Sequence, residues 1–299
     1  MSLVRSPVSL QGAAPAVSQP PAERDRRAPL TVIQPGTGWQ GFGVAELWSY
    51  RELLYFLVWR DVKVRYKQTV LGVAWAVIQP LFTMLIFTVV FGTIGGLDRR
   101  VQAPYPVFAY AGILLWAFFS GAVTQSAQSL IASSHLISKV YFPRLIIPIA
   151  AVGGELVDLG ISCLMMFGLV LGHGLPLTTR ALLLPLFIGA SLLAALGVGT
   201  LLSALTVAYR DFRYVTGFLI QTWMFVSPVA YPLEVIPPRW QLLYALNPMV
   251  GPISGCRSAL LGEAFQWGPI AVSAAASFLL FLLGTVYFRR VERRFADIV

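Results

Sequence analysis

Charged residues are scarce in this chain, and their scarcity excludes a soluble protein. Only 12% of the 299 residues are charged, whereas a typical soluble domain has about 25%. Hydrophobic residues make up 57% of the chain, and the mean hydropathy is +0.73. This composition is that of an integral membrane protein.

The residue types that carry most enzyme and metal chemistry are almost missing. There are two cysteines, Cys163 and Cys256, and two histidines, His135 and His173. The cysteines lack the spacing of a disulfide framework or a metal site. The histidines fall in predicted loops on opposite faces of the membrane, so they cannot share a metal ion. No Ser/His/Asp constellation is credible either, and we therefore expect no catalytic residue and no metal site.

Lysine is also rare, which bears on nucleotide binding. The three lysines are Lys63, Lys67 and Lys139, and none of them follows a glycine. A phosphate-binding P-loop needs glycine directly before its lysine, so that backbone donors and the ammonium surround the phosphates together. This chain cannot supply such an ATP site. We expect it to bind no cofactor and to be no enzyme by itself.

Long apolar runs are what the chain has instead. A helix needs about 20 mostly apolar residues to cross the hydrocarbon core of a bilayer. We predict an all-α integral membrane fold with six transmembrane helices, although the fifth apolar run is short and is cut by Pro228 and Pro232. The runs lie at about residues 70–96, 107–130, 145–171, 181–207, 215–230 and 269–288.

Prolines interrupt the mildly apolar residues 231–262. Broken helical backbone is tolerated at membrane depth only where protein or a water-filled cavity surrounds it. We interpret this segment as a re-entrant helical hairpin between spans 5 and 6, made of two short helices that dip into the outer leaflet. A folded external loop is the alternative.

The residues before the first span have an amphipathic pattern. Between Glu46 and Lys67, apolar residues recur with the i, i+3, i+4, i+7 spacing of one helix face, and most charged residues fall on the other side. We predict a basic helix over residues 44–68 that lies on the membrane surface and leads directly into the first span. An ordinary surface helix followed by a buried core helix is the alternative. The apolar stripe consists of Leu47, Tyr50, Leu54, Leu57, Val58 and Val62.

The two ends of the chain complete the predicted domain organisation. Residues 1–43 are rich in Pro, Ala, Ser and Gly and have no apolar h-region. We therefore expect a mostly disordered cytoplasmic segment and not a signal peptide. Residues 69–290 form the predicted six-span domain, and residues 291–299 form a cytoplasmic tail.

The distribution of lysine and arginine predicts the orientation in the membrane. Six spans place both termini on one side, and that side carries 17 of the 22 basic residues. The positive-inside rule makes this side cytoplasmic. The basic residues of the opposite side are Arg99, Arg100, Arg180, Arg239 and Arg257.

Glu155 and Asp158 lie one helical turn apart in the third predicted span. Ionisable residues inside a membrane are costly and commonly functional, and these two could form a proton or sodium site. The interpretation that we favour is that they lie near the cytoplasmic end of the span, where they cap a helix or pair with an arginine of a neighbouring helix.

Two short cytoplasmic loops have shapes that a soluble partner could grip. In the first loop, serines can cap a short amphipathic helix that Pro143 ends. The second loop is shorter and more charged. A solvated turn is the alternative for each. The candidate contact residues are Ser134, His135, Leu136, Ile137, Ser138 and Lys139 in the first loop, and Arg210, Asp211 and Phe212 in the second.

Aromatic and polar side chains share one face of two predicted spans. Such faces could line a path for a sugar chain, because rings stack on apolar sugar faces and amides bind hydroxyl groups. Packing against lipid or a neighbouring helix is the commoner role of such residues. The residues are Trp75, Gln79 and Phe82 in the first span, and Phe218, Gln221, Thr222 and Phe225 in the fifth.

Several segments resemble one known family, the type-2 ABC transporter permeases that export O-antigen, capsule or teichoic-acid polymers. Residues 54–67, 71–75 and 79–80 resemble the start of these permeases, and residues 136–144 and 209–211 resemble their two cytoplasmic loops. Residues 231–232 and 247–248 resemble their external re-entrant region. The resemblance covers about residues 44–290.

This resemblance implies a homodimer that moves a lipid-linked polysaccharide across the bacterial cytoplasmic (inner) membrane. Two copies of a separate subunit would bind ATP and Mg and drive the transport. The first loop would be a coupling helix seated in that subunit, and Arg60, Asp61 and Lys63 would belong to an interface helix nearby. Aromatic residues of spans 1 and 5, with Tyr231, would line the channel.

Two other functions stay open at this point. An ion-coupled secondary transporter would use Glu155 and Asp158 as its ion site. A membrane-embedded transferase acting on a lipid-linked sugar would need a carboxylate or histidine cluster that the sequence does not display.

Overall fold

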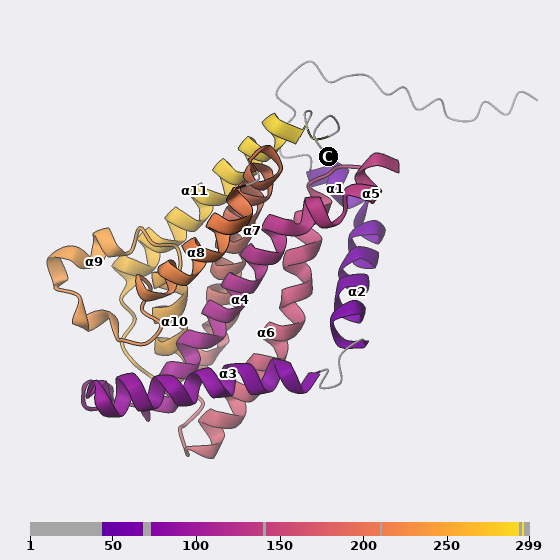
Figure 1. Cartoon of the computed structure of the whole chain (residues 1–299). Coiled ribbons are helices and arrows are strands. Elements are labelled where there is room, and N and C mark those ends of the chain that lie inside the picture. The colour runs from indigo at the N-terminus through magenta and orange to yellow at the C-terminus, as the bar shows by residue number, and fades with distance from the viewer. Residues whose placement is uncertain (1–43, 68–72, 140–141, 210, 293–294, 296–299) are drawn as a thin grey trace, which may run out of the picture. The chain divides into compact units, whose positions relative to one another are not determined.

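The computed structural model describes residues 44–67, 73–139, 142–209, 211–292 and 295, and every element among them is helical. The predicted all-α class is therefore confirmed for this part of the chain, while residues 1–43 lie outside it. The elements in chain order (Figure 1) are α1 (Val44–Ser49), α2 (Arg51–Lys67), α3 (Val73–Phe87), the π-helix η1 (Thr88–Ile94), the 3-10 helix η2 (Leu97–Arg100), α4 (Tyr105–Ala132), α5 (Ser134–Lys139), α6 (Ile146–Gly172), η3 (Thr179–Leu183), α7 (Leu184–Ala208), α8 (Phe212–Phe225), η4 (Leu233–Val235), α9 (Pro238–Tyr244), α10 (Val250–Leu261) and α11 (Trp267–Glu292).

Five helical stretches of the described residues are long and apolar enough to cross a membrane. They correspond to predicted spans 1, 2, 3, 4 and 6. The fifth predicted span is α8, which has only 14 residues. At about 1.5 Å per residue, a helix of this length falls short of a hydrocarbon core about 30 Å thick. The five stretches are Ala74–Ile94, Tyr105–Ala132, Ile146–Gly172, Thr179–Ala208 and Trp267–Glu292.

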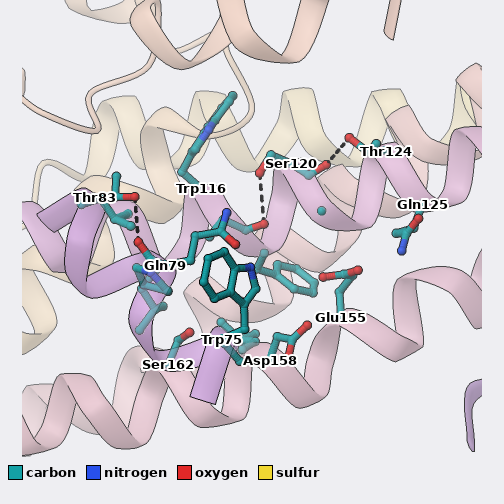
Figure 2. Close-up of a pocket in the computed structure, with 18 of the residues that line it drawn as sticks. Trp75, Gln79, Thr83, Trp116, Ser120, Thr124, Gln125, Glu155, Asp158 and Ser162 are labelled. Atoms are coloured by element: carbon teal, nitrogen blue, oxygen red, sulfur yellow. Dashed lines mark hydrogen bonds between the residues drawn. The ribbon is translucent and has the colours of Figure 1, made fainter. Parts of the chain in front are cut away.

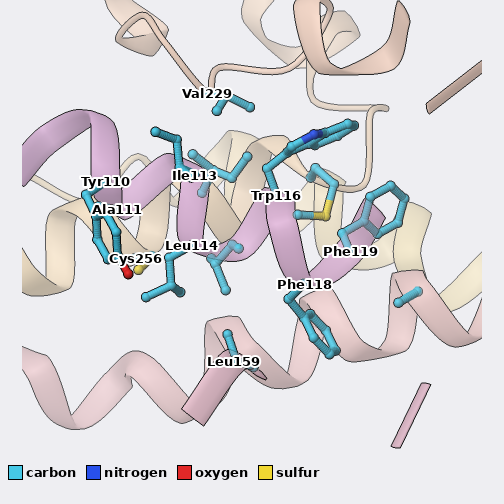
Figure 3. Close-up of a cluster of buried hydrophobic side chains, with 14 of the residues drawn as sticks. Tyr110, Ala111, Ile113, Leu114, Trp116, Phe118, Phe119, Leu159, Val229 and Cys256 are labelled. Atoms are coloured by element: carbon cyan, nitrogen blue, oxygen red, sulfur yellow. The ribbon is translucent and has the colours of Figure 1, made fainter. Parts of the chain in front are cut away.

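Helix α4 is the centre of the bundle. It packs against both α6 and α7, and all its residues from Val107 to Leu115 are buried. Figure 3 shows part of this core, where Leu114 and Phe118 of α4 point towards α6, which carries Leu159. A helix that is apolar on most sides is buried in a protein core or crosses a membrane, and this agrees with the absence of charge in the α4 sequence.

Helices α7 and α11 approach each other most closely at two glycines. A Cβ atom on Gly284 would lie 2.2 Å from the carbonyl oxygen of Gly197, and one on Gly197 would lie 2.5 Å from the backbone nitrogen of Phe281. Small residues allow such backbone contact between membrane helices. The pair therefore fixes how α11 packs on α7.

The predicted amphipathic stripe of α2 faces protein. Leu57 is buried, and the other stripe residues are half-buried, whereas Trp48, Tyr55 and Trp59 are exposed. Helix α2 packs along α6, and the two run side by side in Figure 1. The periodicity thus identified the correct inward face. The surface that covers it in the structure is α6, which the sequence pattern could not specify.

One end of the bundle gathers three elements that are distant in sequence. Helices α1 and α5 and the C-terminal end of α11 lie together at the top of Figure 1. Leu57 of α2, Ile146 of α6 and Phe288 of α11 form a buried apolar cluster there, against which Leu136 and Ile137 of α5 pack. This end carries the first of the two predicted partner-binding loops.

Helix α3 and η1 have the least protein cover. In Figure 1, α3 runs crosswise to α4 and α6, the helices that it contacts. The side chains of Phe82, Leu85 and Val89 are exposed. An apolar surface of this kind requires lipid or another protein chain to cover it.

Candidate functional site

A cavity of about 980 Å³ opens between α2, α3, α4, α6 and α8. Trp75 and Gln79 of α3 line it from one side, and Trp116 and Ser120 of α4 line it from another. Figure 2 shows these lining side chains, with the Trp116 indole pointing away from that of Trp75. The cavity is large enough for a small ligand or for one segment of a longer chain.

Helix α4 supplies a polar row to this cavity. Trp116, Ser120 and Thr124 are spaced four residues apart, which places them on one helix face, and Gln125 lies beside them. The hydroxyls of Ser120 and Thr124 donate to backbone carbonyls of their own helix, at 3.1 Å and 2.7 Å. Each hydroxyl oxygen therefore keeps its lone pairs as acceptors. Indoles, amides and hydroxyls together suit sugar rings and their hydroxyl groups.

One end of the cavity is charged. Arg65 of α2 donates through one nitrogen to Glu155 and through the other to Asp158, both on α6. The Tyr66 hydroxyl donates to the second oxygen of Asp158. Glu155 also lies against Gly121 of α4, where a Cβ atom would come within 2.6 Å of its carboxylate. The predicted pairing of the two carboxylates with an arginine of a neighbouring helix is confirmed.

This ion-pair cluster fixes the charge of both α2 residues. Burial alone would lower the pKa of Arg65, but the hydrogen bonds and charges of Glu155 and Asp158 raise it above its ordinary value. Burial raises the pKa of Tyr66, and the hydrogen bond to Asp158 raises it further. The guanidinium therefore stays charged and the phenol stays neutral at physiological pH.

The predicted sugar-path residues divide between the cavity and the outer surface. Trp75 and Gln79 line the cavity. Phe82, Phe218 and Phe225 are exposed, by 63%, 72% and 62%, and Gln221 and Thr222 are exposed beside them. Tyr231 is half-buried, and its hydroxyl lies 2.8 Å from that of Tyr244. Within this single chain, the aromatic faces of α3 and α8 do not enclose one common path.

The predicted first loop forms the short helix α5. His135 and Lys139 of α5 are exposed, whereas Leu136 and Ile137 are half-buried in the apolar cluster that also holds Leu57. Ser134 is half-buried, and Ser138 belongs to the same helix. In the second loop, Asp211 is exposed and Phe212 begins α8, while Arg210 lies outside the described residues. Helix α5 thus has a polar face that is exposed and an apolar face that packs on the bundle.

Of the charged residues predicted for the interface helix, Arg60 and Lys63 are exposed, whereas Asp61 is half-buried near Gly154 of α6. Arg60 and Asp61 form an ion pair at 2.8 Å within this helix, and Lys63 is exposed. An exposed pair of this kind contributes about 0 to 1 kcal/mol to stability.

Arg257, which the sequence predicts as a charge on the external side, is buried in the structure. It is 2% exposed. It donates to the carbonyls of Phe108, Pro228, Val229 and Tyr231 at 2.6 to 3.2 Å, and its guanidinium carbon lies 3.6 Å from the centre of the Phe108 ring. Its signal in the sequence is a lone charge within the apolar segment of α10.

Asn247 makes a second polar connection nearby. Its side chain accepts a hydrogen bond from the Trp223 indole at 3.0 Å and donates to the Ser227 hydroxyl at 2.9 Å. It thereby ties the end of α8 to the start of α10. The resemblance singled out residues 247–248, and this contact gives a structural reason for an asparagine there.

The sequence has clear relatives among characterised proteins. Residues 52–261 match the ABC-2 type transporter family. The chain is 30% identical over 258 residues to "O-antigen export system permease protein RfbA" of Myxococcus xanthus, covering 85% of this chain and 98% of the relative. It is 26% identical to the protein of that name from Klebsiella pneumoniae, covering 83% and 95%. It is 23% identical to "Polysialic acid transport protein KpsM" of Escherichia coli, covering 75% and 86%.

Proposed function

Because this chain belongs to the ABC-2 type transporter family, we propose that it is the membrane subunit of an ATP-driven exporter of a lipid-linked polysaccharide. The chain is a multi-pass membrane permease without catalytic chemistry of its own, and the ATPase is a separate subunit. The observation that carries the proposal is the match to an O-antigen export permease over 98% of its length.

The proposed assembly is a homodimer with two copies of an ATP-binding subunit. The exposed aromatic faces of α3 and α8 support it, because Phe82, Phe218 and Phe225 lack protein cover in the single chain. In a dimer, these faces would meet the second copy and complete a path that continues from the cavity. Tyr231 would lie at the outer end of this path.

The proposed topology has six crossings with both termini in the cytoplasm. Helix α8 is too short to cross alone, so the fifth crossing would include the segment that follows Phe225. Helices α9 and α10 would then form the re-entrant hairpin on the outer side. The basic residues support this orientation, because 17 of 22 lie on the proposed cytoplasmic side.

Helix α5 is the proposed contact with the ATPase, together with residues 210–212. Its polar residues His135 and Lys139 face outward, while Leu136 and Ile137 pack on the bundle. A push on α5 would therefore reach the cluster that holds α2, α6 and α11. ATP shifts the channel only if it favours one of the channel's states over the other.

The geometry gives no support to the ion-coupled alternative. Glu155 and Asp158 both accept hydrogen bonds from Arg65, and Asp158 also accepts one from Tyr66. A cation would have to displace this guanidinium before it could bind either carboxylate there.

Reconstitution tests the proposed function. The chain and the ATP-binding subunit would be co-purified in mild detergent and placed in proteoliposomes with lipid-linked polysaccharide. We expect the two subunits to co-purify and the glycan to cross only when ATP is hydrolysed. An ATPase subunit whose P-loop lysine is replaced is the control. Transport driven by an ion gradient without ATP would contradict the proposal.

A further inference from the structure

Helix α2 is attached to α6 at three successive levels. At the first level, Leu57 shares a buried cluster with Ile146. At the second, Gly153 of α6 lies so close to Val58 that an added Cβ would be 2.8 Å from the Val58 Cγ2 atom. At the third, Arg65 and Tyr66 bind Glu155 and Asp158.

The third level is the polar one, and it is partly shielded from solvent. The exposed side-chain fractions are 30% for Arg65, 10% for Glu155 and 27% for Asp158. Hydrogen bonds between charged groups are about twice as strong as neutral ones, and shielding preserves them. Loss of Arg65 would leave two neighbouring carboxylates without their shared cation. The Arg60–Asp61 pair differs, because it is exposed and joins residues of a single helix.

Helix α2 connects the apolar cluster at α5 with the wall of the cavity. Near one end, α2 contacts the cluster in which Leu136 and Ile137 of α5 pack. At its other end, Arg65 and Tyr66 line the cavity between α3, α4, α6 and α8. A displacement that enters at α5 can therefore reach the cavity wall through α2 and α6.

We propose that Arg65 is a positioning residue that clamps α2 to α6, so that the two helices move as one body during transport. This inference rests on the proposed function, because it assigns Arg65 a part in the same ATP-driven cycle. Attachment at three levels supports a rigid unit, since a helix that swung away would have to break an apolar contact, the close packing of the Val58 side chain on Gly153 and the ion pairs together.

A designed disulfide tests whether α2 and α6 move together. A Cβ atom on Gly153 would lie 3.8 Å from the Val58 Cβ. The mean distance between the two Cβ atoms of a disulfide is about 3.8 Å, so this pair suits a cross-link. The Val58→Cys/Gly153→Cys pair would be made in a chain with Cys163→Ala and Cys256→Ala and assembled with its ATPase subunit. We expect the pair to oxidise and the cross-linked complex to keep its transport rate. Arrest that a reducing agent reverses would overturn the proposal, and so would failure to cross-link.

A charge-removal series tests the part played by Arg65. We expect Arg65→Gln to lower the amount of glycan moved per ATP hydrolysed by about tenfold, the factor for one lost charge-assisted hydrogen bond. Oxidation of the Val58→Cys/Gly153→Cys pair in the same chain should restore most of that ratio. Arg51→Gln is the matched control, because Arg51 is an exposed arginine of the same helix whose guanidinium contacts Trp48.

The outcomes separate the two proposals. A parent complex that moves no glycan with ATP contradicts the proposed function itself. If the parent complex is active, a fully coupled Arg65→Gln complex contradicts the clamp alone, and so does a coupling defect that the oxidised disulfide leaves unchanged.

Discussion

At the scale of single residues, Arg257 has an unusual set of partners. Its guanidinium binds four backbone carbonyls from α4 and from the chain after α8. The carbonyls of Pro228, Val229 and Tyr231 belong to backbone that has left the helix, whereas that of Phe108 lies within α4. A buried arginine thus replaces the hydrogen bonds that a continuous helix would have made.

Replacing Arg257 with methionine should destabilise the protein strongly. The variant keeps much of the side-chain volume but leaves buried carbonyls without donors, at a cost of about 3 kcal/mol or more. The melting temperature of the purified protein in detergent measures the effect. Arg239→Met, at an exposed residue of α9, should melt close to the parent. Equal melting of both variants would contradict the role assigned to Arg257.

Trp75→Ala should reduce ATP-dependent glycan transport. Trp75 lines the cavity, and loss of one ring contact of about 0.5 to 1.5 kcal/mol corresponds to a decrease of roughly twofold to tenfold. Export in proteoliposomes measures it, with ATPase activity recorded in parallel. Trp240→Ala serves as the control, since Trp240 is an exposed residue of α9 outside the cavity. An unchanged rate for Trp75→Ala would place the glycan elsewhere.

At the scale of elements, the α7–α11 pair depends on two glycines. Gly284→Ala should force the helices apart, because the new methyl group would overlap the Gly197 carbonyl. Overpacking of this kind costs about 1 to 3 kcal/mol, which a lower unfolding midpoint would reveal. Gly189→Ala on the open face of α7 meets no atom within 4 Å and should be neutral or slightly stabilising. Equal midpoints for the two variants would show that α11 does not pack here as described.

The sequence predicted most helices of this fold because apolar length and periodicity are local properties. The stripe from Leu47 to Val62 and the one-turn spacing of Glu155 and Asp158 both follow from helix geometry. Their partners did not follow, because Arg65 lies 90 residues from Glu155 along the chain, and only tertiary packing brings them together. Arg257 was missed for the same reason, although a lone charge in an apolar segment is a usable signal.

The lining of the cavity was likewise predicted only in part from the sequence. The face of α3 with Trp75 and Gln79 was predicted from its composition, whereas the matching row Trp116, Ser120 and Thr124 of α4 was overlooked. Its spacing of four residues was visible in the sequence. In the proposed dimer, contacts between the two chains would decide which residues of α3 and α8 share a path, and a single sequence does not encode such contacts directly.

At the scale of the whole molecule, the proposed six-crossing topology makes a labelling prediction. Single cysteines would be placed in a chain with Cys163→Ala and Cys256→Ala and treated with a membrane-impermeant reagent. We expect Asp98→Cys, His173→Cys and Glu234→Cys to react from outside the cell, and Lys139→Cys and Asp211→Cys to react only after the membrane is opened. These residues are exposed in the structure. Labelling of positions 211 and 234 from the same side would exclude the fifth crossing.

The smallness of α5 has a consequence for how such exporters diversify. The helix has six residues, and Leu136 and Ile137 pack against the bundle's apolar cluster. Because α5 is the proposed contact with the ATP-binding subunit, substitutions at its exposed positions can change that contact without disturbing the fold. Replacing α5 with the corresponding helix of another permease could therefore let this chain bind a different ATP-binding subunit, while the path for the glycan stays the same.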